Sequence, residues 1–420
     1  MLGESELKIC IIGGGPAGIM AAIQAKNNGH EVEVIEKNEK IGKKLSITGK
    51  GRCNLTYIGD TEYFLDNVVT NPKFMMSGIN SFNNVDLIEF VEKLGVKTKK
   101  ERGNRIFLAC DDATILTDAL YKELKRLNIK IRCSSVVSEI LIKDNAVCGV
   151  VLESGEKITA DKVLIATGGA SYPATGSTGD GCKLAQKLGH NIVELKPALV
   201  PIIAYEKDIC SNLEGLTLKN VSLEITNRDK IIDRRFGEMV FTKNGVSGPI
   251  VLSASSKLNK LHDLNSLCSN KVLKLHIDLK PALTFEELYK RLTRDFEKYK
   301  NKELKNALFD LLPKSIIPEV IQISGVASTK QVNSITKQER EGIVKVIKKF
   351  TLTIKGLGSM YVGIVTSGGV NTKEINPKTL ESKLISGLYF AGETIDVDAY
   401  TGGFNLQIAF STGYLAGINM

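Results

Sequence analysis

The first feature of the chain is a glycine-rich turn between an apolar strand and a helix, within residues 9–18. Gly13, Gly15 and Gly18 have the spacing G-x-G-x-x-G. In such a unit the first glycine permits a tight turn, the second lets the backbone approach a diphosphate, and the third lets the helix pack on the strand. The diphosphate would lie at the N-terminus of the helix. The turn therefore predicts an α/β domain that binds a dinucleotide.

The residues around the turn complete a strand–helix–strand unit. We expect strands at 8–12 and 31–36 and a helix at 16–28, with Pro16 in its first turn. The second strand ends in Glu36, at the place where an acid about 20 residues after the glycines binds ribose hydroxyls. An acid there repels a 2′-phosphate, so the pattern favours FAD or NAD over NADP. The alternative is a solvated glycine turn without a ligand, and strand, helix and acid together argue against it.

The bulk properties are those of a globular enzyme. With 420 residues, 43% of them hydrophobic and 25% charged, the chain can form two or three domains with a substantial core. No apolar run reaches the roughly 18 residues of a membrane-spanning helix. Residues 1–6 are acidic and lack the basic start and apolar stretch of a signal peptide. We therefore expect a cytoplasmic enzyme without a membrane segment; the oligomeric state is left open.

Cysteine and histidine show no metal-ligand pattern. The eight cysteines include no C-x-x-C pair, and the four histidines have no ligand spacing. Zinc sites, iron–sulfur clusters and dithiol reductases need paired thiolates at short spacing or suitably placed histidines. The sequence therefore predicts no metal site.

The net charge of +9 comes from 56 basic and 47 acidic residues. Lysine and arginine gather at 97–102, 122–126, 290–305 and 345–349, in several cases with acids interleaved. Such clusters are typical of solvated helix faces, so the pattern does not favour a nucleic acid as partner. An attraction for anionic ligands is the safer inference.

The rest of the chain alternates helical and strand patterns. Residues 41–57 are too rich in Gly, Lys and Thr for a regular element. The expected helices lie near 85–94, 114–127, 181–188, 284–312 and 337–349, and the expected strands within 130–166, as short strands within 196–280, and at 351–354 and 361–366. The apolar stripe of 284–312 is more typical of a domain core than of a partner groove.

The C-terminal part adds a second strong signal. Residues 387–393 form a strand pattern ending in Gly-Glu, and residues from 401 onward open a helix that runs to the end. If the two ends of the sequence meet in space, the segment between them is an insertion.

These motifs, in this order, resemble known flavoproteins. The glycine turn, Glu36, the run Ala166–Gly169 and Gly392-Glu393 resemble the glutathione-reductase-like FAD superfamily. More narrowly, the chain resembles the bacterial BaiN/YhiN-like flavoprotein family, labelled NAD(P)/FAD-dependent oxidoreductase or aminoacetone oxidase family, through the segments 45–56, 171–181, 241–249, 365–370 and 379–383. The resemblance covers nearly the whole chain.

The resemblance implies an α/β fold with a Rossmann-like FAD-binding domain, an inserted β-barrel-like domain and a helical subdomain. The FAD-binding domain would comprise 1–193 and 362–420, the barrel 194–283 and 350–361, and the helical part 284–349. The chain departs from the family at three positions: Tyr57, Lys243 and Phe410 stand where Asn, His and Trp are common. If that His faces the substrate, Lys243 changes the chemistry there.

The resemblance also implies roles for individual residues. Glu36 would hold the adenosine ribose, Val137 would offer its backbone to the adenine, and Glu393 would hold the ribityl chain. The helix beginning near Gly403 would point at the pyrimidine edge and stabilise an anionic reduced flavin. The full predicted cofactor set is Gly13, Gly15, Pro16, Ala17, Gly18, Glu36, Lys37, Lys44, Gly51, Arg52, Cys53, Val137, Thr167, Gly168, Gly169, Gly392, Glu393, Gly403, Phe404 and Asn405.

The catalytic candidates are Arg52, Asn54, Tyr172 and Tyr400. Arg52 is either a cation near the flavin or a substrate carbonyl, or an arginine that pins its loop to the cofactor. Either tyrosine could donate a proton or simply pack against the flavin ring. Cys53 could be a reactive thiol, but we favour the interpretation that it is a packed side chain.

We therefore expect a FAD-dependent oxidoreductase that passes hydride through flavin N5 to or from a small organic substrate. The resemblance to the family implies reduction of an activated, enone-like C=C bond. No second G-x-G-x-x-G follows a strand, so NAD(P)H would dock transiently, or a protein donor or the substrate would supply electrons. The alternatives are an amine or aminoketone oxidase using oxygen, and a flavoprotein that binds RNA or senses redox state without metabolite turnover.

Overall fold

The computed structural model describes residues 6–420, so the acidic start at 1–5 lies outside the described residues. The chain divides into two compact units. Unit 1 comprises the chain up to Ala198 together with Met360–Met420, and unit 2 comprises Leu199–Ser359. The three-domain boundaries expected above stay a prediction.

Unit 1 is built on a five-stranded sheet whose strand pairs are all parallel. Its order is β19 (Leu388–Phe390), β10 (Lys162–Ile165), β1 (Lys8–Ile12), β2 (Glu31–Ile35) and β6 (Lys130–Arg132). All residues of β10 except its first, Lys162, and all residues of β19 are buried. This is expected for a parallel sheet that is covered on both faces. The strand β1, near the start of the chain, and the strand β19, near its end, lie in this one sheet, which confirms that the two ends of the sequence meet in space.

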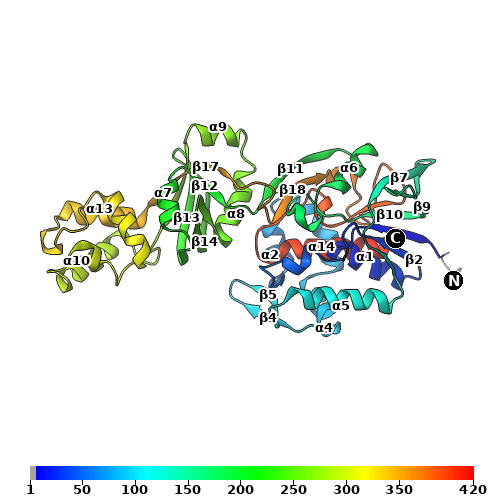
Figure 1. Ribbon diagram of the computed structural model, residues 1–420, viewed down its shortest axis with the longest axis horizontal. Helices are drawn as coiled ribbons and strands as arrows, with labels where there is room; N and C mark the ends of the chain where they lie inside the picture. The colour runs from blue at the N-terminus through cyan, green and yellow to red at the C-terminus, as the bar shows by residue number, and fades with distance from the viewer. Residues whose placement is uncertain (1–5) are drawn as a thin grey trace. The chain divides into compact units, whose positions relative to one another are not determined.

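Two helices from opposite ends of the chain pack against each other. They are α1 (Pro16–Asn27), blue in Figure 1, and α14 (Phe404–Asn419), red. Close contact is possible because Gly413 and Gly417 face α1; a Cβ at Gly417 would lie 2.7 Å from the Ala21 carbonyl oxygen.

Smaller sheets surround this core. The expected meander is β7 (Val137–Lys143), β8 (Ala146–Leu152) and β9 (Lys157–Thr159). A second small sheet consists of β3 (Asn54–Tyr57), β5 (Arg105–Leu108) and β4 (Thr98–Glu101), and a third of β11 (Ile192–Ala198) and β18 (Val365–Val370). The prediction of no regular element over 41–57 was wrong at its end, because β3 gains its hydrogen bonds from β5, some 50 residues later. The helices are α2 (Thr61–Asn67), α3 (Met76–Ser81), α4 (Asn84–Lys93), α5 (Ala113–Arg126) and α6 (Asp180–Lys187).

Unit 2 contains a closed six-stranded barrel. Its order is β12 (Ile202–Ala204), β15 (Gly245–Ser247), β14 (Lys230–Thr242), β13 (Thr217–Asn227), β16 (Leu273–Asp278) and β17 (Phe350–Leu357). Two strands contradict the expectation of short strands: β13 has 11 residues and β14 has 13. Register shifts within this hairpin interrupt the simple alternation that marks a long strand in sequence.

The helices of unit 2 bury the apolar stripe of 284–312 in a core cluster. The predicted continuous helix is wrong: α10 (Phe285–Lys298) ends, and α11 (Leu304–Ala307) follows. The break forms because the backbone near Glu303 pairs with Gln331 instead of continuing the helix. The remaining helices are α7 (Lys207–Asn212), α8 (Pro249–Leu258), α9 (Leu264–Ser269), α12 (Ile317–Ser324) and α13 (Lys337–Lys348). Over residues 6–420, no helix combines the length and the apolarity that crossing a membrane requires.

Candidate functional site

The glycine turn has the geometry of a diphosphate cradle. Gly13 has a φ of +111°, and a Cβ there would collide with the carbonyl oxygen of Ala166. A Cβ at Gly18 would collide with the Gly13 carbonyl oxygen. At Gly15, the N-cap of α1, a Cβ would meet nothing within 4 Å. The turn is therefore closed toward the protein and open over the helix N-terminus, where an anion binds.

Glu36 lies buried at the end of β2, beside the turn. Its Oε2 accepts a hydrogen bond from the Gly14 N–H (2.8 Å), and its Oε1 accepts from the Asn38 backbone (2.8 Å) and side chain (2.7 Å). Ser135 donates its N–H to the Glu36 carbonyl oxygen (3.0 Å), which brings the segment leading to Val137 close to this acid. A carboxylate has about four lone-pair sites, so Glu36 can still accept hydrogen bonds from a ribose.

A partly buried ion pair joins two predicted cofactor residues that are 349 positions apart. Lys44 Nζ lies 2.8 Å from Glu393 Oε2, and it also donates to Ser171 Oγ (2.8 Å). Glu393 Oε1 accepts from Ser171 Oγ (3.1 Å) and the Thr366 N–H (2.5 Å). Burial alone would raise the pKa of Glu393, but the charge of Lys44 and these hydrogen bonds outweigh it and hold the pKa below its ordinary value.

The ends of β10 and β19 come together around this ion pair. Gly168, with a φ of +76°, follows β10, and Gly392, with a φ of +68°, follows β19. Thr167 Oγ1 accepts a hydrogen bond from the Gly181 N–H (3.1 Å). A Cβ at Gly169 would collide with the Thr366 side chain. Glycine at these positions lets the backbone that follows β10 lie close to the Glu393 carboxylate.

The N-terminus of α14 is fixed on β3. Gly403, its N-cap, has a φ of +94°, and a Cβ there would lie 2.5 Å from the Thr56 carbonyl oxygen. Asn405 clamps the preceding turn by donating to the Ala399 carbonyl oxygen (2.8 Å) and accepting from its N–H (3.0 Å). Phe404 stacks on Tyr57 with ring centroids 5.0 Å apart. The helix start is therefore held rigidly, with its positive end available to stabilise negative charge.

Two buried polar atoms near this helix start have no hydrogen-bond partner within residues 6–420: the Tyr57 hydroxyl and Asn54 Oδ1. Burial raises the pKa of the Tyr57 phenol well above its ordinary value. Buried polar groups in native proteins are nearly always hydrogen-bonded, so both atoms are suited to a ligand that carries polar groups. Together with the open Gly15 position, they make the site fit a FAD. Sequence reasoning named Asn54 but treated Tyr57 only as a departure from the family.

Arg52 is held by carboxylates of the neighbouring sheet. Its guanidinium pairs with Glu101 and, at 2.8 Å, with Asp111. It also lies over the Phe107 ring, 4.6 Å from the centroid. These contacts tie the loop of Arg52 to the protein's own carboxylates, and Glu101 and Asp111 already neutralise the cation. Gly51 beside it faces open space.

Lys37 and Cys53 also have roles within the protein. Lys37 pairs with Asp180 at 2.6 Å and donates to Thr178 Oγ1 at 2.5 Å, which ties β2 to the start of α6. Cys53 is fully buried with a φ of +56°, and burial raises the pKa of its thiol to about 12. A neutral buried thiol supports the packed-side-chain interpretation of Cys53.

The two candidate tyrosines differ in accessibility. Tyr172 has a φ of +53° and is 36% exposed. Its N–H donates to the Met360 carbonyl oxygen (3.4 Å), which brings its backbone close to the start of the segment Met360–Met420. Tyr400 is partly buried, and its N–H donates to the Asn67 carbonyl oxygen (2.9 Å).

Sequence reasoning missed a buried carboxylate cluster before α14. Asp398 is 1% exposed, and its Oδ1 accepts hydrogen bonds from Ser367 Oγ (2.9 Å) and the Thr70 hydroxyl. The run Asp396-Val-Asp398 after Gly-Glu was the available signal, because acids are rarely buried without partners. Within the described chain, no group of three or more His, Cys, Asp or Glu could hold a metal ion.

Comparison with known proteins decides the family. The model of the family described as HI0933-like protein Rossmann domain matches residues 7–419. This chain belongs to the HI0933-like family. Membership confirms the predicted Rossmann-like FAD-binding fold and the BaiN/YhiN-like flavoprotein group.

Relatives of this HI0933-like protein share its full length. The 3-dehydro-bile acid delta(4,6)-reductase of Clostridium scindens is 32% identical over 420 residues, covering 98% of each chain. The ribosomal RNA dihydrouridine synthase of Haemophilus influenzae is 30% identical over 415 residues, covering 98% of this chain and 97% of the relative. The HI0933-like protein is accordingly a FAD-dependent oxidoreductase.

Solved structures share the fold at low sequence identity. The 3-ketosteroid-delta4-(5alpha)-dehydrogenase of Rhodococcus jostii has a TM-score of 0.55 at 15% identity, covering 100% of this chain and 98% of its own. The 3-ketosteroid delta1-dehydrogenase of Sterolibacterium denitrificans has a TM-score of 0.52 at 11% identity, covering 99% of each. These likenesses concern the fold alone.

Proposed function

We propose that this enzyme reduces a C=C bond conjugated to a carbonyl group in a small organic substrate, with NAD(P)H as the electron donor. The observation that carries the proposal is the agreement between two full-length relatives. One is named as a delta(4,6)-reductase of a 3-dehydro-bile acid and the other as a synthase of dihydrouridine. Both names describe saturation of a C=C bond conjugated to a carbonyl.

A bound FAD would supply hydride transfer at flavin N5. The glycine turn and the N-terminus of α1 would hold the diphosphate, Glu36 the ribose, and the Val137 backbone the adenine. The Lys44–Glu393 pair would face the ribityl chain. The rigid N-terminus of α14 would stabilise negative charge that develops at the pyrimidine edge.

Saturation of a conjugated C=C bond needs a proton at the α-carbon after hydride reaches the β-carbon. Tyr172 is our choice of donor, because its side chain is 36% exposed and it directly follows Ser171, which is hydrogen-bonded to both Lys44 and Glu393. A phenol there could reach a substrate bound beside the flavin. Arg52 is a weaker candidate, because two carboxylates already neutralise it.

Anaerobic stopped-flow spectroscopy of the FAD-loaded enzyme tests the proposal. Flavin absorbance is followed after mixing with NADH, then NADPH, then amines, and the reduced enzyme is next mixed with a panel of enones. We expect bleaching by a nicotinamide and reoxidation by an enone, with Tyr172→Phe slowing reoxidation but not bleaching and Tyr361→Phe serving as control. Bleaching by an amine, with rapid reoxidation by oxygen and peroxide release, would establish the oxidase instead.

A second candidate substrate is a uracil base within ribosomal RNA, for which the charge distribution is the favouring observation. Unit 2 contains 27 of the 56 basic and 18 of the 47 acidic residues, whereas unit 1 contains 29 of each. The whole net charge of +9 therefore belongs to unit 2. A basic unit supports polyanion binding. Loss of dihydrouridine from ribosomal RNA after gene deletion, measured by mass spectrometry of nucleosides, would select this substrate over a free metabolite.

A further inference from the structure

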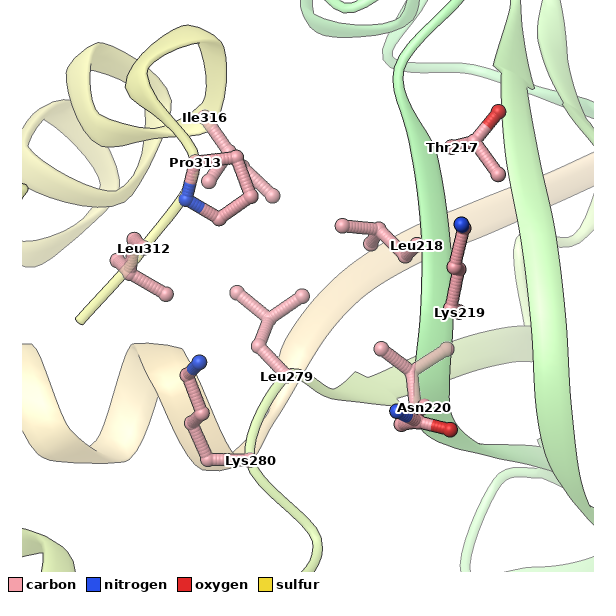
Figure 2. A pocket seen from close by; sticks show the side chains of 10 residues that line it. Thr217, Leu218, Lys219, Asn220, Leu279, Lys280, Leu312, Pro313 and Ile316 are labelled. Carbon is pink, nitrogen blue, oxygen red and sulfur yellow. The ribbon is translucent and has the colours of Figure 1, made fainter. Parts of the chain in front are cut away.

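Unit 2 contains an open cavity of about 210 Å³ between the barrel and the helical segment. On one side lies β13, and on the other the turn that leads into α12 (Figure 2). Its apolar lining includes Leu218, Leu279, Leu312 and Ile316, each of which is buried. The parts of these side chains that face the cavity form an apolar floor, which the apolar part of a small ligand can cover.

A β-bulge in β13 places polar side chains at the edge of this cavity. In the β13–β14 ladder Leu218 pairs with Met239, but the next pair is Val221 with Gly237. The register shift places Lys219 and the residue after it outside the regular alternation, at the cavity edge. A bulge of this kind re-aims a side chain, here a lysine beside an apolar floor.

The charges around the cavity are uncompensated cations. Lys219 and Lys280 line it together with no acidic residue. The nearest acid by sequence, Asp278, is engaged by Lys348 at 2.6 Å. Burial and then the nearby charge of Arg291 lower the pKa of Lys280, as expected for a partly buried ammonium that lacks a counter-ion.

We propose that this cavity is a second ligand site of unit 2, which binds a small amphipathic carboxylate with its apolar body on the Leu279 floor and its carboxylate between Lys219 and Lys280. Figure 2 shows these two lysines on opposite walls of the cavity. A nucleic-acid backbone would pair with the lysines but would leave the apolar floor uncovered, so it fits the cavity less well. A simple inorganic anion would leave the same floor uncovered, so the cavity selects a ligand with both parts.

Isothermal titration calorimetry of the full-length, FAD-loaded protein tests the proposal with sodium octanoate, 1-octanol and acetate as probes. We expect octanoate to bind at least tenfold more tightly than either partial mimic, since only octanoate supplies both parts. Lys280→Met and Lys219→Met should each weaken octanoate binding about tenfold through loss of one charge-assisted contact. Lys345→Met, which removes an exposed lysine of α13 outside the cavity, should change binding less than twofold.

A second measurement does not depend on the variants. An octanoate analogue that carries a photoreactive diazirine is irradiated with the wild-type protein, and the labelled peptides are mapped by mass spectrometry. Labelling within 217–221, 279–280 or 312–316 supports the proposal. Labelling elsewhere, equal binding of octanol, or unchanged binding to Lys280→Met would each overturn it.

Discussion

Replacement of Lys44 by Met should destabilise unit 1 through its effect on Glu393. The wild-type ammonium lies 2.8 Å from the carboxylate, and the two side chains are only 25% and 20% exposed. Methionine keeps much of the aliphatic length of lysine but removes the charge. Glu393 would then keep its hydrogen bonds from Ser171 and the Thr366 N–H, which are neutral donors.

The expected loss follows from burial of an unpaired charge. Breaking a fully buried pair costs about 3–5 kcal/mol. Because a fifth of the Glu393 side chain is exposed and neutral donors remain, we expect about 2–3 kcal/mol at pH 8. With a urea m-value of about 3 kcal/mol/M for a large unit, the midpoint of its transition falls by roughly 0.7–1 M. Circular dichroism and flavin fluorescence can follow that transition.

The pH dependence gives the sharper test. In the wild type the pKa of Glu393 lies below its ordinary value of 4.5, so its contribution is present above pH 4.5 and is lost as the pH falls through the folded-state pKa. In Lys44→Met, burial without the cation raises the pKa of Glu393, so the carboxyl can take up a proton. The difference between the two proteins should therefore shrink as the pH falls from 8 to 5.

Two further variants of the protein serve as controls. Lys44→Met/Glu393→Gln should recover at least half of the loss, because the unpaired charge is gone. Lys43→Met, which removes an exposed neighbouring lysine, should stay within about 0.5 kcal/mol of the wild type. A loss below 0.5 kcal/mol for Lys44→Met, or one that grows toward pH 5, would refute the argument.

Three other outcomes are expected. Gly403→Ala should lower the FAD content of the purified protein at least tenfold, measured from the ratio of absorbance at 450 and 280 nm, because a Cβ would lie 2.5 Å from the Thr56 carbonyl oxygen at a φ of +94°; full occupancy would contradict this. His190 is buried and paired with Glu374, and burial, which outweighs that pairing, lowers the pKa of the imidazole. Its protonation therefore favours the unfolded state, and the stability lost below about pH 6.5 should be smaller in His190→Gln, measured by urea titrations at pH 7.5 and 5.5. Cys53 should resist iodoacetamide at pH 8 in the folded protein, because its thiol pKa is raised to about 12; peptide mass spectrometry detects any adduct.

The parts of the fold that the sequence predicts well are local. The unit β1–α1–β2 follows from glycine spacing, strand alternation and a helix-starting proline, all within 30 residues. The resemblance to flavoproteins added the position of Val137, which no local pattern marks. The position of Glu36 was also predicted from local sequence, since its distance from the glycines is fixed by the length of one helix.

The parts that sequence reasoning missed depend on distant partners. The two interpretations of Arg52 could not be separated from the sequence, because its partners Glu101 and Asp111 lie about 50 residues or more along the chain and approach it only in the fold. The strand β3 exists because β5 pairs with it. Neither pairing has a signature in the local sequence, so a catalytic and a pinning arginine give the same pattern until the sheet is known.

A dinucleotide site and a reaction place different demands on the sequence. Holding a dinucleotide needs backbone geometry, and glycines at Gly13 and Gly403 are required there by sterics alone. Choosing a substrate needs side chains whose protonation and contacts can vary while the fold persists. Relatives named for a bile acid and for a ribosomal RNA share this chain's full length. Such different names fit a family in which the flavin site is kept and the substrate-binding surface varies. Tyr172 and the net charge of unit 2 are therefore the places where experiments on substrate choice should begin.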